Sequence, residues 1–461
     1  MNKRFCILCA NFTGKRILLN FSRNESRLVR SSAELDESVS NELDNNLKPR
    51  RHPGVMNHKP VSLPEVIKKS ISNLLAGEVP KKQMLCEAQP LERYLMARQV
   101  PVEKAEFFDK RLETMNEVRN SLEIDIESLP QEEQDRWNKS ISDKVDNLLK
   151  KKLYSWNQID FTNYMSQLYL VTRSAAEYAV VYKIFQEICK RTNFVPNTVF
   201  DFGSGMGSVI WAANSIWGSS VKEYFCVDSS SHMNSLSEQI LKRTEPDIMK
   251  RIFYRQFLPS SSEITSDLVI SSYSLLELSS KQNRLDTLIN LWKRTGKYLV
   301  LIEFGSEGGF KVLNEARTAI LHHVNKGKTF ENEASYIFAP CPHHNSCPRS
   351  DDKCFFEASY TSFPQKPEHL RKEYYSYVVF AKGERHEKVD SHWPRIVQPV
   401  LCRSRHVICR LCSSSGNMKE VIITPSKHGK KAYRCAKASR WGDLFPFKLK
   451  PYEKSPTEKK D

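Results

Sequence analysis

A glycine-rich turn constrains the fold of this chain more than any other segment. The sequence DFGSGMG (residues 201–207) follows an apolar, strand-like run and precedes a helical stretch that begins at Ser208. Glycine lets the backbone approach a ligand closely, and a helix start offers free N–H groups to polar ligand atoms. A second acid, Asp228, ends the next strand-like run. The order strand, acid, glycines, helix, strand and acid predicts a nucleotide-binding α/β fold.

The acid at the start of the turn distinguishes two classes of nucleotide ligand. A dinucleotide fingerprint reads G-x-G-x-x-G and requires glycine where this chain has Ser208. Asp201 stands two residues before the first glycine, where its charge would repel a pyrophosphate but suits the cationic sulfonium of S-adenosylmethionine (SAM). Asp228 is expected to accept hydrogen bonds from the ribose hydroxyls. We therefore predict a SAM-dependent methyltransferase (Rossmann-like) core.

Further strand-like runs alternate with helical stretches from residue 156 onward. The runs begin at residues 198, 223, 251, 267 and 298. This alternation predicts βαβ units and a parallel sheet, which a late run at residues 374–380 would close. After the fourth run, Ser271, Ser272 and Tyr273 are expected to line the pocket. The Asn/Asp-Pro-Pro-Tyr motif of base N-methyltransferases is absent there, as is a cysteine nucleophile. The sequence identifies no catalytic residue.

The charge balance favours a polyanionic partner. Seventy Lys and Arg stand against 54 Asp and Glu, a formal excess of 16 positive charges, and such an excess favours nucleic acid. The first 24 residues contain five Lys and Arg, interleaved apolar side chains and no acid, which predicts a mitochondrial import segment. Near the other end, aromatic and basic residues (Tyr433-Arg434, Lys437 and Arg440-Trp441) suit stacking on RNA bases. No run approaches the ~18 apolar residues of a membrane span.

Three cysteines fall within fourteen residues, at Cys341, Cys347 and Cys354. In the mitochondrial matrix such a group favours metal ligation over disulfides. The gaps of five and six residues suit a 4Fe-4S cluster, whereas zinc knuckles favour shorter ones. The close pair Cys409 and Cys412 keeps zinc as the alternative. A fourth ligand would come from Cys402, Cys409, Cys412 or Cys435.

The composition divides the chain into five parts. We expect an import segment at residues 1–30, a helical N-terminal extension at 31–155, a methyltransferase-like core at 156–385 with a cysteine-rich metal-binding insert at 336–360, a small β-rich C-terminal module at 386–450, and a basic tail at 451–461.

Several motifs resemble a known family, the methyltransferase-like assembly factors of the mitochondrial small ribosomal subunit. They cover roughly residues 160–446 and are DFGSGMGS, DLVISSYSLLEL, YLVLIEFGSEGGF, APCPHHNSCPRSDDKCFF, RHVICRLCSSSG and YRCAKASRWGDLFP. The combination of the Cys-Pro-His segment with the Trp-Gly-Asp ending is specific to this family.

The resemblance implies a matrix protein that contacts rRNA of the small subunit, binds SAM and holds a 4Fe-4S cluster. The implied SAM contacts are Asp201, Gly203, Gly205, Gly207 and Asp228. The implied cluster ligands are Cys341, Cys347, Cys354 and Cys412, with Cys409 as the other choice for the fourth. Two functions remain open: an assembly factor required for mitochondrial translation, and an active SAM-dependent rRNA methyltransferase.

Overall fold

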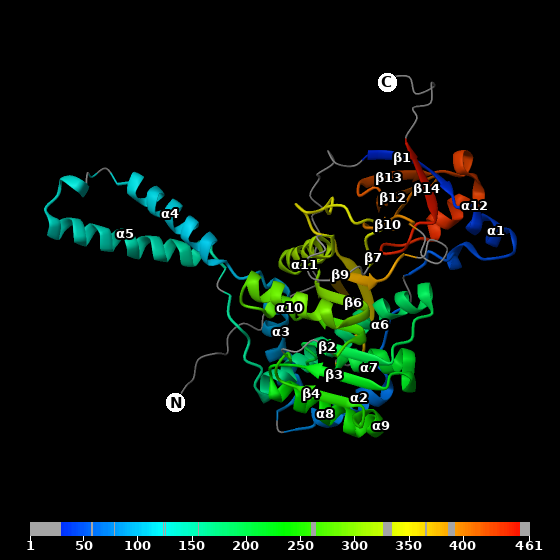
Figure 1. Cartoon of the computed structure of the whole chain (residues 1–461), viewed down its shortest axis with the longest axis horizontal. Coiled ribbons are helices and arrows are strands. Elements are labelled where there is room, and N and C mark those ends of the chain that lie inside the picture. The colour runs from blue at the N-terminus through cyan, green and yellow to red at the C-terminus, as the bar shows by residue number, and fades with distance from the viewer. Residues whose placement is uncertain are drawn as a thin grey trace, which may run out of the picture.

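Two β-sheets organise the chain in a computed structural model (Figure 1). The described residues are 29–56, 59–77, 79–122, 124, 126–154, 156–259, 264–325, 334–364, 367–385 and 392–451. Most of the expected import segment and of the basic tail lies outside them. Within the described residues, no helix combines the length and hydropathy that crossing a bilayer requires.

The larger sheet is the predicted α/β core. Its strands run in the order β4 (Ile252–Arg255), β3 (Glu223–Val227), β2 (Thr198–Phe202), β5 (Ser266–Ser272), β6 (Thr295–Phe304), β9 (Leu370–Lys382) and β7 (Ser335–Ala339), with β8 (Phe356–Thr361) also paired to β9. The first five are parallel, and β9 runs antiparallel to β6. The predicted α/β class is therefore confirmed. The late run at residues 374–380 is a strand, β9, as predicted, but it does not close the sheet because β7 and β8 pair with it on the side away from β6.

Helices cover both faces of this sheet because its strands are apolar on both sides. In β2, Val199 packs into one core and Phe200 into the other. The first face carries α6 (Asn163–Thr192), α7 (Ser208–Trp217) and α8 (Ser231–Thr244), and the short α9 (Pro246–Met249) follows α8. The second carries α10 (Lys281–Arg294) and α11 (Glu307–Asn325). The chain order reverses between β2 and β5, and ligands of such sheets bind at that switch point.

The smaller sheet lies in the C-terminal part. Its order is β10 (Arg395–Ile396), β12 (Val407–Cys412), β13 (Met418–Ile423), β1 (Val29–Leu35) and β14 (Phe447–Pro451), with β11 (Leu401–Cys402) paired to β12. A helix, α12 (Pro425–Ala438), packs on it. Cys435, which the sequence suggested lay in a β-rich segment, is on this helix.

The N-terminal region differs from the helical extension that the sequence predicted. It starts with β1, whose residues Ser31 to Leu35 pair with β14. The polar sequence VRSSAEL alternates too weakly to reveal this strand, which is specified by its distant partner. The helices α1 (Glu37–Asp44), α2 (Glu65–Leu74) and α3 (Lys81–Ala97) follow, and apolar residues of the last two belong to the main core.

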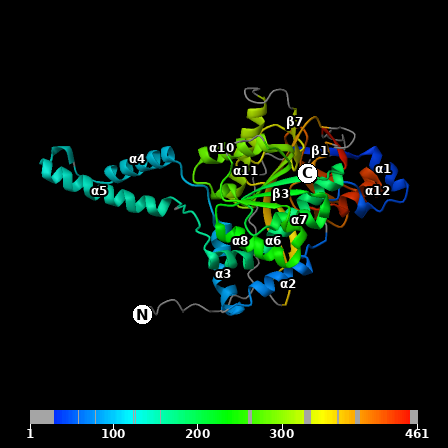
Figure 2. The ribbon, with the colours of Figure 1, turned by 60° about the horizontal axis from the view of Figure 1, so that its bottom comes forward.

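One element stands away from the two sheets. The helices α4 (Lys104–Asn120) and α5 (Gln131–Lys152) form a hairpin that projects from the rest of the chain in both ribbon views (Figures 1 and 2). We call these residues, 104–152, the helical arm. The segment that follows α5 returns to the body near the carboxyl edge of the large sheet, where Trp156 donates a hydrogen bond to the carbonyl of Leu276 (3.3 Å).

Candidate functional site: a crevice and a group of thiols

A cavity of about 300 Å³ lies at the switch point, where β2 and β5 end. The glycine turn forms one wall through Gly203, Ser204 and Gly205, and Ser272 and Tyr273 form another. Its size and position fit a small-molecule ligand.

The glycines have different reasons for lacking a side chain. Gly203 has a φ of +74°, and a Cβ there would lie 1.9 Å from the Ser274 hydroxyl oxygen. It is therefore required for packing of the turn against the end of β5, not for approach of a ligand as the sequence suggested. Gly205 has a φ of +49° and opens onto the cavity, where a Cβ would meet no side chain within 4 Å. Gly207, also at positive φ, is outside the cavity lining and is the N-cap residue of α7.

Asp228 lies on the cavity wall directly after β3. Its two carboxylate oxygens accept backbone hydrogen bonds from Gly205 (2.8 Å) and Ser230 (2.9 Å). Burial raises the pKa of Asp228, and these two N–H groups partly oppose that rise. Each oxygen keeps a second lone pair, so the carboxylate can still accept from a ligand hydroxyl.

Asp201 is held behind the wall and does not line the cavity. Its side chain is buried, and neither oxygen finds a hydrogen-bond partner among the described residues. Burial, Asp228 and Glu177 together raise its pKa well above the usual range. In this structure Asp201 acts on the cavity from behind, whereas the sequence predicted direct contact.

Glu177 on α6 lines the cavity, and sequence reasoning missed it. It accepts hydrogen bonds from the hydroxyls of Tyr169 and Ser208, and it lies 3.5 Å from the Arg173 guanidinium. Burial raises its pKa, which Arg173 opposes. The only sequence signal was an acid within the apolar helix SAAEYAVVY. Acids on and behind this wall favour a cationic ligand group, as SAM carries.

Tyr273 has an unusual backbone for its residue type. Its φ is +57°, a region that costs a non-glycine residue about 1–3 kcal/mol. The Arg173 guanidinium lies 5.0 Å from the ring centroid, and the buried hydroxyl has no hydrogen-bond partner among the described residues. Ser272 lines the cavity beside it, as the sequence predicted, whereas Ser271 does not.

A second cavity, much smaller, has four cysteines in its lining, and we call it the sulfur cavity. Cys341, Cys347 and Cys354 of the cysteine-rich loop line it together with Cys412 at the end of β12. None of the four is in a disulfide. Burial and then the other three thiols raise the pKa of Cys412 well above its usual range. The structure thus brings together the four cysteines that the resemblance implied.

Cys409 lies elsewhere. It is three residues before Cys412 on the same strand, and residues at odd spacing point to opposite faces of a sheet. Cys409 packs in the core of the smaller sheet, beside Ala33 and Leu411. No set of three Cys, His, Asp or Glu side chains in the described ranges is arranged to hold a metal ion. The structure therefore gives no direct evidence for a bound metal, either a zinc ion or an iron–sulfur cluster.

Arginines hold the loop around the thiols. Arg317 of α11 donates to the carbonyls of His343 (3.1 Å) and Asn345 (2.6 Å). Arg349 donates to the carbonyl of Val397 (3.3 Å), and Arg395 donates to that of Pro340 (3.1 Å). All three arginine side chains are buried.

His343 contacts one of the four cysteines directly. Its Nε2 lies 3.2 Å from the sulfur of Cys412. Burial, with Arg317 second, lowers the pKa of His343 to about 4, so the imidazole is neutral near pH 7. His343 is buried against Cys412.

The crevice and the thiols both fall within one sequence family. The profile described as mitochondrial small ribosomal subunit Rsm22 matches residues 163–446. The chain belongs to the Rsm22 family. The human relative, "Ribosome assembly protein METTL17, mitochondrial", is 37% identical over 407 residues, which cover 86% of this chain and 85% of that protein.

Two fungal relatives are more distant. "Ribosome assembly protein RSM22, mitochondrial" of Saccharomyces cerevisiae is 20% identical and covers 58% of this chain and 65% of that protein. "Rsm22-cox11 tandem protein 2, mitochondrial" of Schizosaccharomyces pombe is 33% identical, covering 44% of this chain and 32% of that protein. Magnesium protoporphyrin IX methyltransferase from Synechocystis aligns over 51% of this chain and 94% of that one, with 13% identity and a TM-score of 0.30. The fold assignment rests on the strand order given above.

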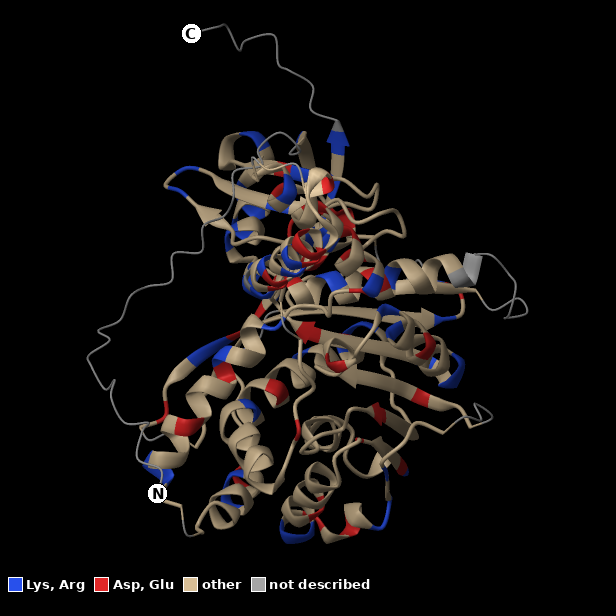
Figure 3. Cartoon of the chain, turned by 90° about the vertical axis from the view of Figure 1, so that its left-hand side faces the viewer, with Lys and Arg blue, Asp and Glu red and all other residues tan. Residues whose placement is uncertain are grey.

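The C-terminal part of this Rsm22-family chain is strongly basic. Residues 392–451 contain thirteen Lys and Arg against two Asp and Glu; Figure 3 shows Lys and Arg in blue, including on the strand that leads to the C-terminus. Helix α12 carries five of these cations and no acid. Trp441, however, is buried and packs against Phe355 (ring centroids 5.1 Å apart), so it is not exposed for stacking on bases.

Proposed function

We propose that this chain is an assembly factor of the mitochondrial small ribosomal subunit, that it binds rRNA, and that it works in the mitochondrial matrix. The observation that carries the proposal is the convergence of four cysteines from two distant segments, Cys341–Cys354 and Cys412, at the base of the basic C-terminal sheet. The names of the human and yeast relatives support the assembly role and the mitochondrial location.

The four cysteines that line the small cavity fit a 4Fe-4S cluster. Such a cluster takes four thiolates and is larger than a single ion, so its ligands stand further apart. Bound there, it would join the loop to β12 covalently and carry negative charge. Burial and Cys341 raise the pKa of Cys347, and Arg317 and Arg349 partly oppose that rise. Zinc is the alternative, and the gaps of five and six residues between the loop cysteines are longer than those that zinc knuckles favour.

The crevice fits SAM. Gly205 leaves space for a ligand, Asp228 offers acceptor lone pairs, and Glu177 places a second carboxyl group on the wall. In the assembly function SAM stabilises the crevice as a ligand. In the second candidate function, rRNA methylation, it supplies the methyl group. The strained Tyr273 beside the cavity favours keeping this second function, because strain gathers at functional sites.

The RNA contact is assigned to the C-terminal sheet and α12. Lys430, Arg434 and Lys437 are exposed on α12, and cations arranged in this way displace counterions from phosphates. This basic face lies on the same sheet as Cys412. A cluster that joins the cysteine-rich loop to that sheet would therefore matter for ribosome binding.

Cys412→Ser and Cys409→Ser form a matched pair that tests the proposal. Both residues are buried on β12, and only Cys412 lines the sulfur cavity. Anaerobically purified wild type and Cys409→Ser should contain iron and sulfide and absorb in the visible range, whereas Cys412→Ser should lose both. Cys412→Ser should also lose co-sedimentation with the mitochondrial small subunit. Iron-free wild-type protein, or full ribosome association of Cys412→Ser, would exclude the proposed role of the cluster.

A further inference from the structure

The helical arm is built as an independent projection. Its helices pack on each other through Val118 of α4 and through Ile141, Val145 and Leu149 of α5. These residues form a separate small core and are not part of the body's cores. A projecting hairpin exposes both helices to solvent, and it therefore needs a reason beyond the stability of the body.

The half of α4 nearest the body leaves large apolar side chains exposed. Phe107 is 38% exposed, Phe108 is 64% exposed and Leu112 is 56% exposed. The two rings are in edge contact, with centroids 6.1 Å apart. Phe108 and Leu112 are four residues apart and so lie on one side of the helix. Burial of such side chains is favourable, and none of the described residues covers them here. The stripe has the spacing of a helix that binds in a groove.

The charge of the arm is opposite in sense to that of the rest of the chain. Residues 104–152 contain ten Lys and Arg against twelve Asp and Glu, which leaves 60 against 42 for the remainder. The acids gather at the far end: residues 121–135 contain six acids and no Lys or Arg. Glu132 and Glu133 stand in the first turn of α5, where acids also stabilise the helix start. That role does not explain the lack of cations across the whole turn.

This distribution selects the kind of partner. A surface without cations gains nothing from counterion release and is repelled by phosphates, so RNA does not suit the end of the arm. A protein surface rich in Lys and Arg is attracted to it. The apolar stripe adds a second requirement, a hydrophobic groove beside those cations. A basic protein meets both requirements, and nucleic acid meets neither.

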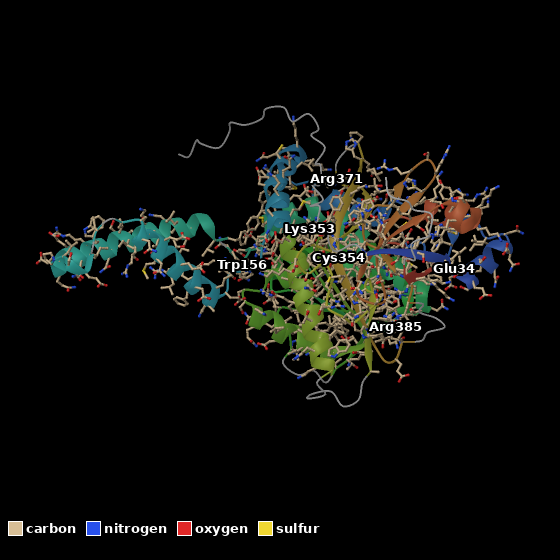
Figure 4. All side chains as sticks on the ribbon, turned by 90° about the horizontal axis from the view of Figure 1, so that it is seen from above. Glu34, Trp156, Lys353, Cys354, Arg371 and Arg385 are labelled. Carbon is tan, nitrogen blue, oxygen red and sulfur yellow. The ribbon has the colours of Figure 1, made fainter. Side chains whose placement is uncertain are left out.

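We propose that the helical arm docks on a basic protein, with Phe108 and Leu112 in an apolar groove and the acidic end against Lys and Arg side chains. The C-terminal sheet then serves RNA and the arm serves protein. This inference depends on the proposed function in one respect, because a particle of RNA and basic proteins is where such a partner is sought. Trp156 lies at the root of the arm (Figure 4) and donates a hydrogen bond to the body. The arm, which binds protein, is thereby anchored to the body that carries the RNA-binding sheet.

Photo-crosslinking of the full-length chain tests the proposal. A benzophenone amino acid replaces Phe108, and mitochondrial small-subunit particles are irradiated. We expect an adduct that survives ribonuclease and is removed by protease. The variant Phe108→Ser with Leu112→Ser, tested with the crosslinker at Phe107, should lower the yield at least fivefold, whereas Leu370→Ser, at a site 66% exposed outside the arm, should not. An adduct that ribonuclease removes, or one with the mass of a second copy, would overturn the proposal.

Charge variants separate this inference from the proposed function. The triple change Glu132→Lys, Glu133→Lys and Asp135→Lys should weaken binding of a fluorescent deca-lysine peptide to the purified chain about tenfold. The neutral triple Glu132→Gln, Glu133→Gln and Asp135→Asn, which spares the helix start from added cations, should give an intermediate loss. The control triple, three exposed acids outside the arm, is Glu223→Lys, Asp247→Lys and Asp286→Lys. Equal affinity of the arm and control triples would sink the inference even if the chain binds ribosomes normally. If the wild-type chain binds the peptide but does not bind the small ribosomal subunit, only the proposed function is contradicted.

Discussion

The Arg98 guanidinium donates a hydrogen bond to the Glu277 carboxylate across 2.7 Å, and so ties the root of the helical arm to the wall of the crevice. Arg98 is fully buried, and its guanidinium lies 5.0 Å from the Trp156 ring centroid. The two ends of the arm therefore meet at one cation. Glu277 itself lines the cavity, so the arm and the crevice share a structural element.

Removing Arg98 should destabilise the body. In Arg98→Met, Glu277 keeps a mostly buried carboxylate without its cation, and breaking such a pair costs about 3–5 kcal/mol. Arg98→Met and Glu277→Gln together should cost less than the sum of the single changes, with a coupling of ~1–3 kcal/mol in urea unfolding. Strict additivity of the two changes would mean that the contact contributes nothing.

Because of the buried Glu303, we expect the free energy of unfolding to fall as the pH rises. Glu303 is fully buried on β6, one oxygen accepts from the Leu276 N–H (3.1 Å), and the other has no partner among the described residues. Burial raises the pKa of Glu303 to about 8. Between pH ~4.5 and ~8 the folded protein holds a proton that the unfolded chain releases, so the free energy of unfolding falls by ~1.4 kcal/mol per pH unit at most.

Glu303→Gln should remove this dependence. The amide stays neutral, so the variant should be close to wild type at pH 5 and more stable by a few kcal/mol at pH 8. Urea unfolding at pH 5, 6, 7 and 8 measures the difference, and Glu223→Gln on the exposed end of β3 is the control. Parallel curves for wild type and Glu303→Gln would mean that Glu303 is ionised in the fold.

Glu187 predicts the opposite behaviour at acid pH. It pairs with Arg395 at 2.6 Å and Arg191 at 2.7 Å, and so joins α6 to the smaller sheet. Burial alone would raise the pKa of Glu187, but the two arginines outweigh burial and hold its pKa at about 2. The stabilisation is complete above pH ~4.5 and is lost as the pH falls toward 2, by roughly 3 kcal/mol.

Glu187→Gln should abolish that acid transition. At pH 7 it should also lose about 3–5 kcal/mol, because Arg395 remains buried without its anion. Urea unfolding of wild type and variant between pH 2 and 7 tests both effects. Because Arg395 also lines the sulfur cavity, the smaller sheet should unfold first in the variant, as hydrogen exchange of β12 would report. Unchanged exchange in β12 would contradict this link between the sheets.

The sequence predicted the large sheet well because its strands carry local signals. Each strand from β2 to β6 is an apolar run between turn residues, and the glycine turn fixes the first crossover. Pairings between distant segments have no such local signal. Strand β1 is recognised only through β14, which follows it by more than 400 residues. The helical arm was read as helix, but nothing in its periodicity indicated that it leaves the body.

The residues of the site likewise fall into those that a local motif predicts and those that only tertiary packing brings together. Asp228 and Gly205 line the crevice because strand ends place them there, and a motif can predict strand ends. Glu177 reaches the cavity from a helix 24 residues before Asp201, and only tertiary packing brings it there. The choice between Cys409 and Cys412 likewise required the direction of each side chain on β12, which the spacing alone does not give until the strand is known.

Gly205 gives a test of the crevice that spares the rest of the fold. Gly205→Ala adds a methyl group that meets no side chain within 4 Å but enters the space proposed for SAM. Gly218→Ala is the control, because Gly218 also has a positive φ (+54°) and open surroundings, yet lies outside the cavity lining. Gly205→Ala should cost about 1 kcal/mol of stability, as alanine is strained at positive φ, and Gly218→Ala should cost more, because the ψ of Gly218 is −127°, outside the left-handed region open to alanine. Only Gly205→Ala should lower SAM affinity, by at least tenfold in calorimetric titration. Equal SAM affinity of the two variants would place the ligand outside this crevice.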